Sequence, residues 1–263
     1  MGQRLVERAP GGRRVALTRA GELLLEHSAH ILAHAQAARA DLAALAEGRL
    51  GTLRLGVFPS IAARLGATLV QELRRSLPQM QLSLVEGPSD TWLLQRLEAG
   101  ELDLAFAVLP LPEGPFEAVD VHEDEYVLLV GADTPLARTG RAAVLEDMRD
   151  LPLVRHVGTV AGEDHLRRHG VEPRFDYVSQ INSTTLGLVA EGAGAAFVPR
   201  LVMDPGDARV RSLELAPPFR ISRRIAIVRH RHRRNVPGAD ELVSVARRAF
   251  ESVGLARAPS QGN

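Results

Sequence analysis

A strand that leads directly into a helix, at residues 51–77, constrains the fold of this chain more than any other stretch. Residues 51–57 alternate apolar and less apolar side chains, which is the period of a β-strand. From Ile61 to Leu77 an apolar residue recurs at every fourth position, so these side chains share one face of a helix. Pro78 ends that helix. The unit predicts a fold of the α/β class.

The same alternation of strands and helices continues almost to the end of the chain. Repeated strand–helix units predict parallel sheets joined by right-handed crossovers. We predict strands at 81–86, 102–108, 119–130, 153–155, 174–178, 195–198 and 223–229, and helices at 90–99, 163–169, 183–191 and 239–250.

A long helix, predicted at residues 18–48, precedes these units. Thr18 is its predicted N-cap and Gly48 ends it. Apolar or small side chains recur along it in heptads, as in the seam of a coiled coil. The seam consists of Leu17, Leu24, Ile31, Ala38 and Leu45, with Gly21, Ser28, Ala35 and Leu42 between them. This pattern favours a dimerising helix, and packing of the helix on its own domain is the alternative.

Residues 1–17 are rich in arginine and contain a turn signal. Pro10-Gly11-Gly12 separates two short apolar stretches, which predicts a small basic hairpin. A frayed, solvated terminus is the alternative. Arg8, Arg13 and Arg14 are the candidates for DNA contacts, of the kind that bind phosphates and position a protein without reading sequence.

Composition excludes several classes of function. The 263 residues contain no cysteine, so neither a disulfide framework nor a thiolate nucleophile is available. Lys+Arg and Asp+Glu balance at 32 each, so no overall charge attracts nucleic acid or anionic lipid. The chain has no signal-peptide pattern and no apolar run long enough to span a membrane, which predicts a soluble, cytoplasmic protein.

No motif indicates a cofactor, a metal or a catalytic centre. The sequence lacks a Gly-x-Ser-x-Gly elbow, a phosphate-binding loop and a complete Gly-x-Gly-x-x-Gly. His230 and His232 alternate along a predicted strand, but no cysteine or nearby acidic residue completes a metal site. We therefore expect no cofactor, no metal and no enzyme activity.

Four motifs, in a characteristic order and spacing, relate the chain to a known family. They are Leu17-Thr-Arg-Ala-Gly-Glu22, Gly51-Thr-Leu-Arg-Leu-Gly56, Gly100-Glu-Leu-Asp-Leu104 and Leu188-Val-Ala-Glu-Gly-Ala-Gly194, the last followed by Val198-Pro199. With these motifs the chain resembles LysR-type transcriptional regulators, from Leu5 to about Phe250. The resemblance implies a homodimer or homotetramer that binds a small-molecule effector and, where a complete helix-turn-helix is present, promoter DNA.

The implied fold is an effector-binding domain with two Rossmann-like lobes, of the type 2 periplasmic-binding-protein kind. The implied boundaries are 1–17 for the wing remnant of a winged helix-turn-helix, 18–48 for the linker helix, 51–124 with 229–263 for the first lobe, and 125–228 for the second. The strands at 119–130 and 223–229 would cross between the lobes. The family's recognition helix would precede Met1, so we expect a misplaced start or a truncated gene, which in-frame sequence upstream of Met1 would test.

The effector site is expected where helices begin after parallel strands. Such helix starts present free N–H groups and the positive end of the helix dipole, which suit an anion. The candidates are Pro59, Ser60, Ser89 and Asp90 in the first lobe, and Arg155, Thr159, Asn182 and Ser183 in the second, with Val198 and Pro199 as an apolar wall. Simple helix capping is the alternative for Ser60 and Asp90, and a solvated loop position is the alternative for Arg155.

These features together favour the effector-sensing and oligomerising part of a transcriptional regulator, which binds a small, anionic metabolite between its lobes. A solute-binding protein for transport is the alternative, although the heptad helix and the lack of an export signal disfavour it. An α/β enzyme with Ser60 as nucleophile is a third possibility that lacks an identifiable base.

Overall fold

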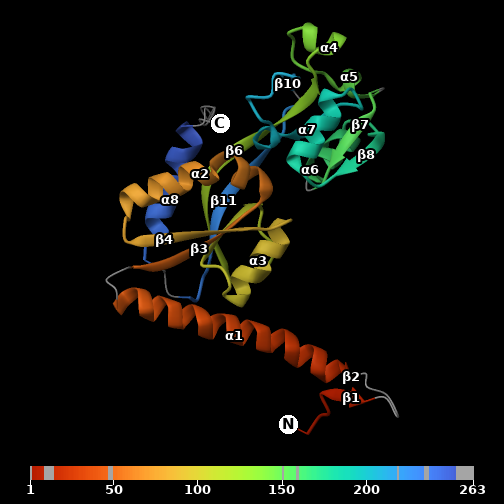
Figure 1. Ribbon diagram of the computed structural model, residues 1–263. Helices are drawn as coiled ribbons and strands as arrows, with labels where there is room; N and C mark the ends of the chain where they lie inside the picture. The colour runs from red at the N-terminus through yellow and green to blue at the C-terminus, as the bar shows by residue number, and fades with distance from the viewer. Residues whose placement is uncertain are drawn as a thin grey trace.

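The chain folds into two α/β lobes preceded by a long helix. The structure is a computed structural model that describes residues 2–8, 15–46, 50–149, 151–157, 160–217, 219–233 and 237–252. Figure 1 shows the long helix α1 running along the first lobe, with a small hairpin at its far end. In the part of the chain that the structure describes, no helix combines the length and apolar character that a membrane span requires.

The N-terminal hairpin and helix match the prediction. They are β1 (Val6–Arg8), β2 (Val15–Leu17) and α1 (Arg19–Ala46). The two strands pair antiparallel, and Thr18 caps α1 because its Oγ1 accepts a hydrogen bond from the backbone N–H of Gly21 at 3.1 Å. The predicted turn at Pro10-Gly11-Gly12 lies outside the described residues.

The first lobe is built on the strand–helix unit at residue 51. Its elements are β3 (Gly51–Val57), α2 (Pro59–Ser76), β4 (Met80–Glu86), α3 (Asp90–Ala99), β5 (Leu104–Leu109), β11 (Ser222–His230) and α8 (Ala239–Ser252). As predicted, β3 pairs parallel with β4 and β5. β11 then adds antiparallel to β5.

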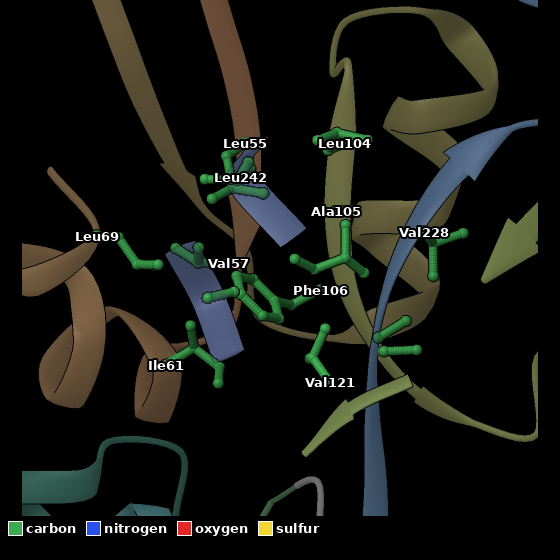
Figure 2. Packing of buried hydrophobic residues seen from close by; sticks show 14 of the residues in the cluster. Leu55, Val57, Ile61, Leu69, Leu104, Ala105, Phe106, Val121, Val228 and Leu242 are labelled. Atoms are coloured by element: carbon green, nitrogen blue, oxygen red, sulfur yellow. The ribbon is translucent and has the colours of Figure 1, made fainter. Parts of the chain in front are cut away.

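The periodic leucines of α2 fill the core of this lobe. Leu65, Leu69 and Leu73 are at most 1 % exposed, and each fully buried leucine contributes about 2 kcal/mol. Figure 2 shows Ile61 and Leu69 of α2 directed toward Val57 of β3, with the Phe106 ring beside Val57. The helix face predicted from the sequence is therefore the face that packs on the sheet.

The second lobe surrounds the far half of one long strand, β6 (Phe116–Gly131). Its other elements are α4 (Pro135–Arg138), α5 (Leu145–Arg149), β7 (Leu153–His156), α6 (Val160–Arg168), β8 (Phe175–Ser179), α7 (Asn182–Ala190), β9 (Ala196–Pro199), the 3₁₀ turn η1 (Arg200–Val202) and β10 (Val210–Glu214). β7 and β8 pair parallel, while β9 and β10 pair antiparallel with β6.

The second half of β6 is buried on both faces. Tyr126, Leu128 and Val130 belong to one apolar cluster, whereas Val127 and Leu129 belong to another. Alternate side chains of a strand point to opposite faces, so a continuous apolar run is what a strand between two cores requires.

Short elements of the second lobe escaped prediction from the sequence. The helices α4 and α5 have 4 and 5 residues, and η1 has 3, which is too short for a helical period to appear. β10 is a 5-residue strand at the edge of the sheet. It was not predicted because the burial of its side chains depends on pairing with β6.

Two strands connect the lobes, as predicted. β6 pairs with β11 over its first part and with β9 and β10 over its second. Ile225 to Val228 of β11 pack in the core of the first lobe, because pairing with β5 holds them there. We therefore propose that the chain returns to the first lobe near Ser222 rather than at residue 229.

Candidate functional site

A cavity of about 430 Å³ lies where the two lobes meet. It is bordered by the carboxyl ends of the parallel strands and by the first turns of α2, α3 and α7, because strands of one direction end at the same edge of a sheet. The lining residues are Phe58, Pro59, Ser60, Pro88, Ser89, Asp90, Thr91, Val108, Leu109, Pro110, Tyr126, His156, Val157, Ala161, Gln180, Asn182, Pro199, Val202 and Arg223. Such a volume suits a small molecule.

An ion pair between the two crossing strands stands at the wall of the cavity. Nε and Nη2 of Arg223 in β11 both lie 2.9 Å from Oδ2 of Asp124 in β6. The Asp124 carboxylate is fully buried, and its Oδ1 accepts a hydrogen bond from the backbone N–H of Leu201 at 3.1 Å. Burial raises the pKa of Asp124, and the charge of Arg223 opposes this rise.

The guanidinium of Arg223 also contacts the first lobe. Nη2 donates to the Ser60 hydroxyl at 3.1 Å, and Cζ lies 5.1 Å from the centre of the Phe58 ring. The Arg223 side chain keeps 11 % of its surface exposed. One arginine therefore joins β6, β11 and the start of α2 while it faces the cavity.

Asp90 places a carboxylate in the cavity at the start of α3. Ser89, not Asp90, is the N-cap of this helix, because the Ser89 hydroxyl accepts from the backbone N–H of Trp92. Oδ2 of Asp90 accepts from the backbone N–H of Val108 at 2.8 Å. Burial raises the pKa of Asp90. Hydrogen bonds from the backbone N–H groups of Val108 and of Asp90 itself, and the charge of Arg223, offset only part of that effect.

His156 and Asn182 bring polar groups from the second lobe. The His156 ring is buried, and its Nδ1 lies 3.0 Å from the Thr185 hydroxyl. Burial, together with the positive charge of Arg223, lowers the pKa of His156 to about 4, so the ring is neutral near pH 7. Asn182 Oδ1 is buried at the start of α7 and has no hydrogen-bond partner among the described residues.

The comparison with known proteins identifies the family. Residues 46–251 match the family described as the LysR substrate binding domain. The chain belongs to the LysR family of transcriptional regulators. A protein named "Probable hydrogen peroxide-inducible genes activator" from Mycobacterium xenopi is 34% identical over 137 residues, which cover 52% of this chain and 71% of the relative.

Solved structures show the same LysR fold. Full-length CbnR in complex with its target DNA superposes with a TM-score of 0.73 at 22% identity, over 90% of this chain and 83% of CbnR. The effector-binding domain of BenM with its effector benzoate superposes with a TM-score of 0.66 at 20% identity, over 81% of this chain and 97% of that domain. The predicted type 2 periplasmic-binding-protein-like architecture is confirmed.

The structure of this LysR chain brings together part of the predicted site. Pro59, Ser60, Ser89, Asp90, Asn182 and Pro199 line the cavity. Val198 is fully buried in the second-lobe core, since it precedes Pro199 on β9 and points to the opposite face. Ser183 is exposed outside the lining, one position along α7 from Asn182. Thr159 lies outside the described residues.

Arg155 and His156 show the same alternation on β7. Arg155 does not line the cavity, and its Nε lies 2.5 Å from Oε1 of Glu163 in α6. His156 takes the cavity side of the strand. Neighbouring residues of a strand point to opposite faces. The sequence prediction chose Arg155, which points toward α6, instead of His156, which lines the cavity.

Sequence analysis also missed Arg223, Asp124 and Tyr126. The only signal for Asp124 was an acidic interruption of an apolar strand, and Arg223 stands among other arginines. Tyr126 begins an apolar run in which nothing distinguishes a core position from a cavity position. Their grouping depends on the pairing of β6 with β11.

Arg8 and the predicted dimerising residues of α1 are not among the residues that line the cavity. Arg8 is in β1, while Arg13 and Arg14 lie outside the described residues. Several predicted seam residues are exposed, namely Leu17 at the end of β2 and Leu24, Ile31, Ala38 and Leu42 in α1. Leu45 lies in the last turns of α1.

Proposed function

We propose that this chain senses a small-molecule effector in the cavity between its lobes and thereby regulates transcription. The observation that carries the proposal is that both lobes and both crossing strands contribute polar side chains to one cavity. A ligand held there contacts Asp90 in the first lobe and Asn182 in the second, so its affinity depends on how the lobes are arranged. A ligand that prefers one arrangement shifts the population toward it.

We propose that effector binding is transmitted to DNA through α1 and through its pairing with a second copy of the chain. The seam residues Ile31 and Leu42 are 66% and 67% exposed, as expected for a helix face that pairs with a second copy. CbnR, which has the same fold, has been solved on its target DNA. We propose that promoter DNA is the partner of the complete regulator. In that regulator the paired α1 helices would orient the helix-turn-helix domains.

The signal is proposed to be binding rather than thiol chemistry. The peroxide-responsive name of the Mycobacterium xenopi relative raises the possibility of an oxidation sensor. These 263 residues contain no cysteine, and without a thiol neither a sulfenic acid nor a disulfide can form. We therefore propose a reversible, non-covalent effector for this chain.

We also propose that the effector leaves unchanged. The Ser60 hydroxyl accepts a hydrogen bond from Arg223, and a guanidinium cannot take up the proton that a serine nucleophile must lose. The characterised role of the family is transcriptional regulation, which is consistent with a site that binds without reacting.

A blocking substitution at the rim of the cavity tests the proposal. Val157 lines the cavity and is 42% exposed, so Val157→Trp narrows the cavity without entering a core. Val178 is 62% exposed in the same lobe and outside the lining, so Val178→Trp is the matched control. Metabolites are screened by thermal shift, because a ligand of the folded state raises the melting temperature.

Compounds that stabilise the wild type and Val178→Trp should lose their effect on Val157→Trp. A compound that stabilises all of these proteins equally binds elsewhere, and that result would contradict the assignment of the cavity. A broad metabolite screen without any stabilising compound would also count against an effector site.

A further inference from the structure

We propose that the effector is a zwitterion of the amino-acid type, whose ammonium group binds Asp90 and whose carboxylate binds Arg223. This inference rests on the proposed function, since it names the chemical class of ligand for the same cavity. It also refines the anion expected from the helix starts alone. The lining residues with ionised side chains, within the described part of the chain, are one carboxylate and one guanidinium.

The Asp90 carboxylate is an incompletely satisfied acceptor. An ionised carboxylate offers about four acceptor positions. The backbone N–H of Val108 occupies one of them, and the backbone N–H of Asp90 itself also donates to this carboxylate, so acceptor positions remain open. The neighbouring Ser89 hydroxyl accepts from the backbone N–H of Trp92, and no hydrogen bond joins it to the Asp90 carboxylate in the described structure. The raised pKa of Asp90 agrees with this geometry. The effect of burial on the pKa exceeds the combined effect of the backbone N–H groups of Val108 and Asp90 and of the Arg223 charge. A ligand ammonium group supplies both the missing charge and the missing N–H donors.

Arg223 is an incompletely used donor. Its Nε and Nη2 are held by Asp124 and Ser60. Nη1 makes no hydrogen bond to any residue that the structure describes, and the side chain is part of the cavity lining. Because Asp124 and Ser60 fix the guanidinium plane, the N–H groups of Nη1 have a set direction and can bind a carboxylate with little further ordering.

The charges around the cavity argue against a plain anion. The Asp124 carboxylate, 2.9 Å away, already neutralises Arg223. His156 is neutral near pH 7 because its pKa is about 4, so it adds no positive charge. A ligand with only a carboxylate would meet the starts of α2 and α7, each equivalent to about half a positive charge, but would leave Asp90 unpaired and repelling. A ligand with both groups satisfies each side.

The other residues that line the cavity indicate what side chain the ligand carries. Val108, Val157 and Val202 supply an apolar wall, and a volume of about 430 Å³ leaves room for a side chain beyond the charged groups. Asn182 Oδ1, buried and without a partner in the described chain, is a further acceptor for an ammonium N–H from the second lobe. An amino acid with an apolar or aromatic side chain fits this set.

Matched ligands separate the proposed roles of Asp90 and Arg223. The common protein amino acids are first screened by thermal shift. Each amino acid that binds is then compared by calorimetry with its desamino acid and its decarboxylated amine; for phenylalanine these are 3-phenylpropionate and phenethylamine. We expect the amino acid to bind about tenfold or more tightly than either analogue, since each analogue forfeits one charge-assisted hydrogen bond.

Asp90→Asn is the diagnostic variant. Its amide oxygen can still accept from Val108, while the charge is removed. It should weaken binding of the amino acid about tenfold or more and should leave binding of the desamino acid unchanged or improved. Asp133→Asn, at an exposed acid outside the cavity lining, is the matched control and should change neither.

Specific outcomes would overturn the inference. These are equal or tighter binding of the desamino acid by the wild type, an Asp90→Asn variant that binds the amino acid as well as the wild type does, or a screen in which plain carboxylates bind and amino acids do not. In each of these cases the proposed function still stands if Val157→Trp prevents binding of the ligand that was found. If the ligand binds Val157→Trp as well as it binds the wild type, the assignment of the cavity as the effector site is wrong.

Discussion

The buried histidine of the cavity makes a prediction about pH and stability. The pKa of His156 falls from an ordinary 6.5 to about 4, because the ring is buried and Arg223 is positively charged. As the pH falls through about 6.5, the unfolded chain takes up a proton at this position and the folded chain does not. The free energy of unfolding therefore decreases as the pH falls from about 6.5 toward 4.

The size of this effect follows from the pKa difference. Each unit of pKa corresponds to about 1.4 kcal/mol, so a difference of about 2.5 between the folded and unfolded chain is equivalent to about 3 kcal/mol. The raised pKa values of Asp90 and Asp124 act with the opposite sign, because the folded chain holds those protons more tightly. A comparison between variants that share both carboxylates removes their contribution.

His156→Asn provides that comparison. Its amide can keep the hydrogen bond to the Thr185 hydroxyl, and it has no proton to titrate. Urea unfolding of the wild type and the variant, at steps from pH 7 down to pH about 4, should show the wild type losing about 3 kcal/mol relative to the variant. His27→Asn, at an exposed position on α1, controls for the substitution itself.

Parallel pH profiles for the wild type and His156→Asn would refute this reasoning. So would a histidine resonance of His156 that titrates near 6.5 in the folded protein by NMR. Either result would mean that solvent reaches the ring and that the cavity is wetter than the burial of His156 indicates.

Two further substitutions test the packing and the proposed dimer. Gly194→Ala should destabilise the protein by about 1–3 kcal/mol in urea unfolding, since the new Cβ would lie 2.4 Å from the carbonyl oxygen of Pro152. Gly187→Ala should be neutral or stabilising, because a Cβ there would meet no atom within 4 Å other than those of its chain neighbours and its own helix backbone. Equal effects of the two substitutions would contradict the packing. Ile31→Glu combined with Leu42→Glu should halve the mass measured by light scattering, because charges on the seam would prevent the helices from pairing. The melting temperature of the lobes should not change, because both side chains are exposed. An unchanged mass would show that this seam does not mediate assembly.

The Arg223–Asp124 pair links the cavity to the two strands that connect the lobes. It joins the strands that run between the lobes, and it touches Ser60 at the start of α2 and the backbone of Leu201 in η1. A ligand carboxylate on Nη1 would therefore act on the group that ties both crossing strands together. Under the proposed function, this contact is the route by which a bound carboxylate would change the angle between the lobes.

Much of the fold could be read from local patterns. The period of two in β3 and the period near four in α2 predicted both elements and the faces that they bury, because those periods are properties of the backbone itself. Gly100, with φ of 78°, ends α3 where the sequence placed it, since glycine adopts this conformation without strain. The heptads of α1 predicted a long helix, which the structure contains.

The sequence by itself also located the helix starts at Ser60, Asp90 and Ser183 to within one residue. Helices that follow parallel strands begin at one edge of the sheet. Only the tertiary structure decided which charges meet there. Arg223 hydrogen-bonds to Ser60 across 163 positions of chain, and this contact exists because β11 returns between β5 and β6. The choice of His156 over Arg155 likewise depends on which face of β7 turns to the cavity, and a strand pattern leaves that open until its neighbours are in place.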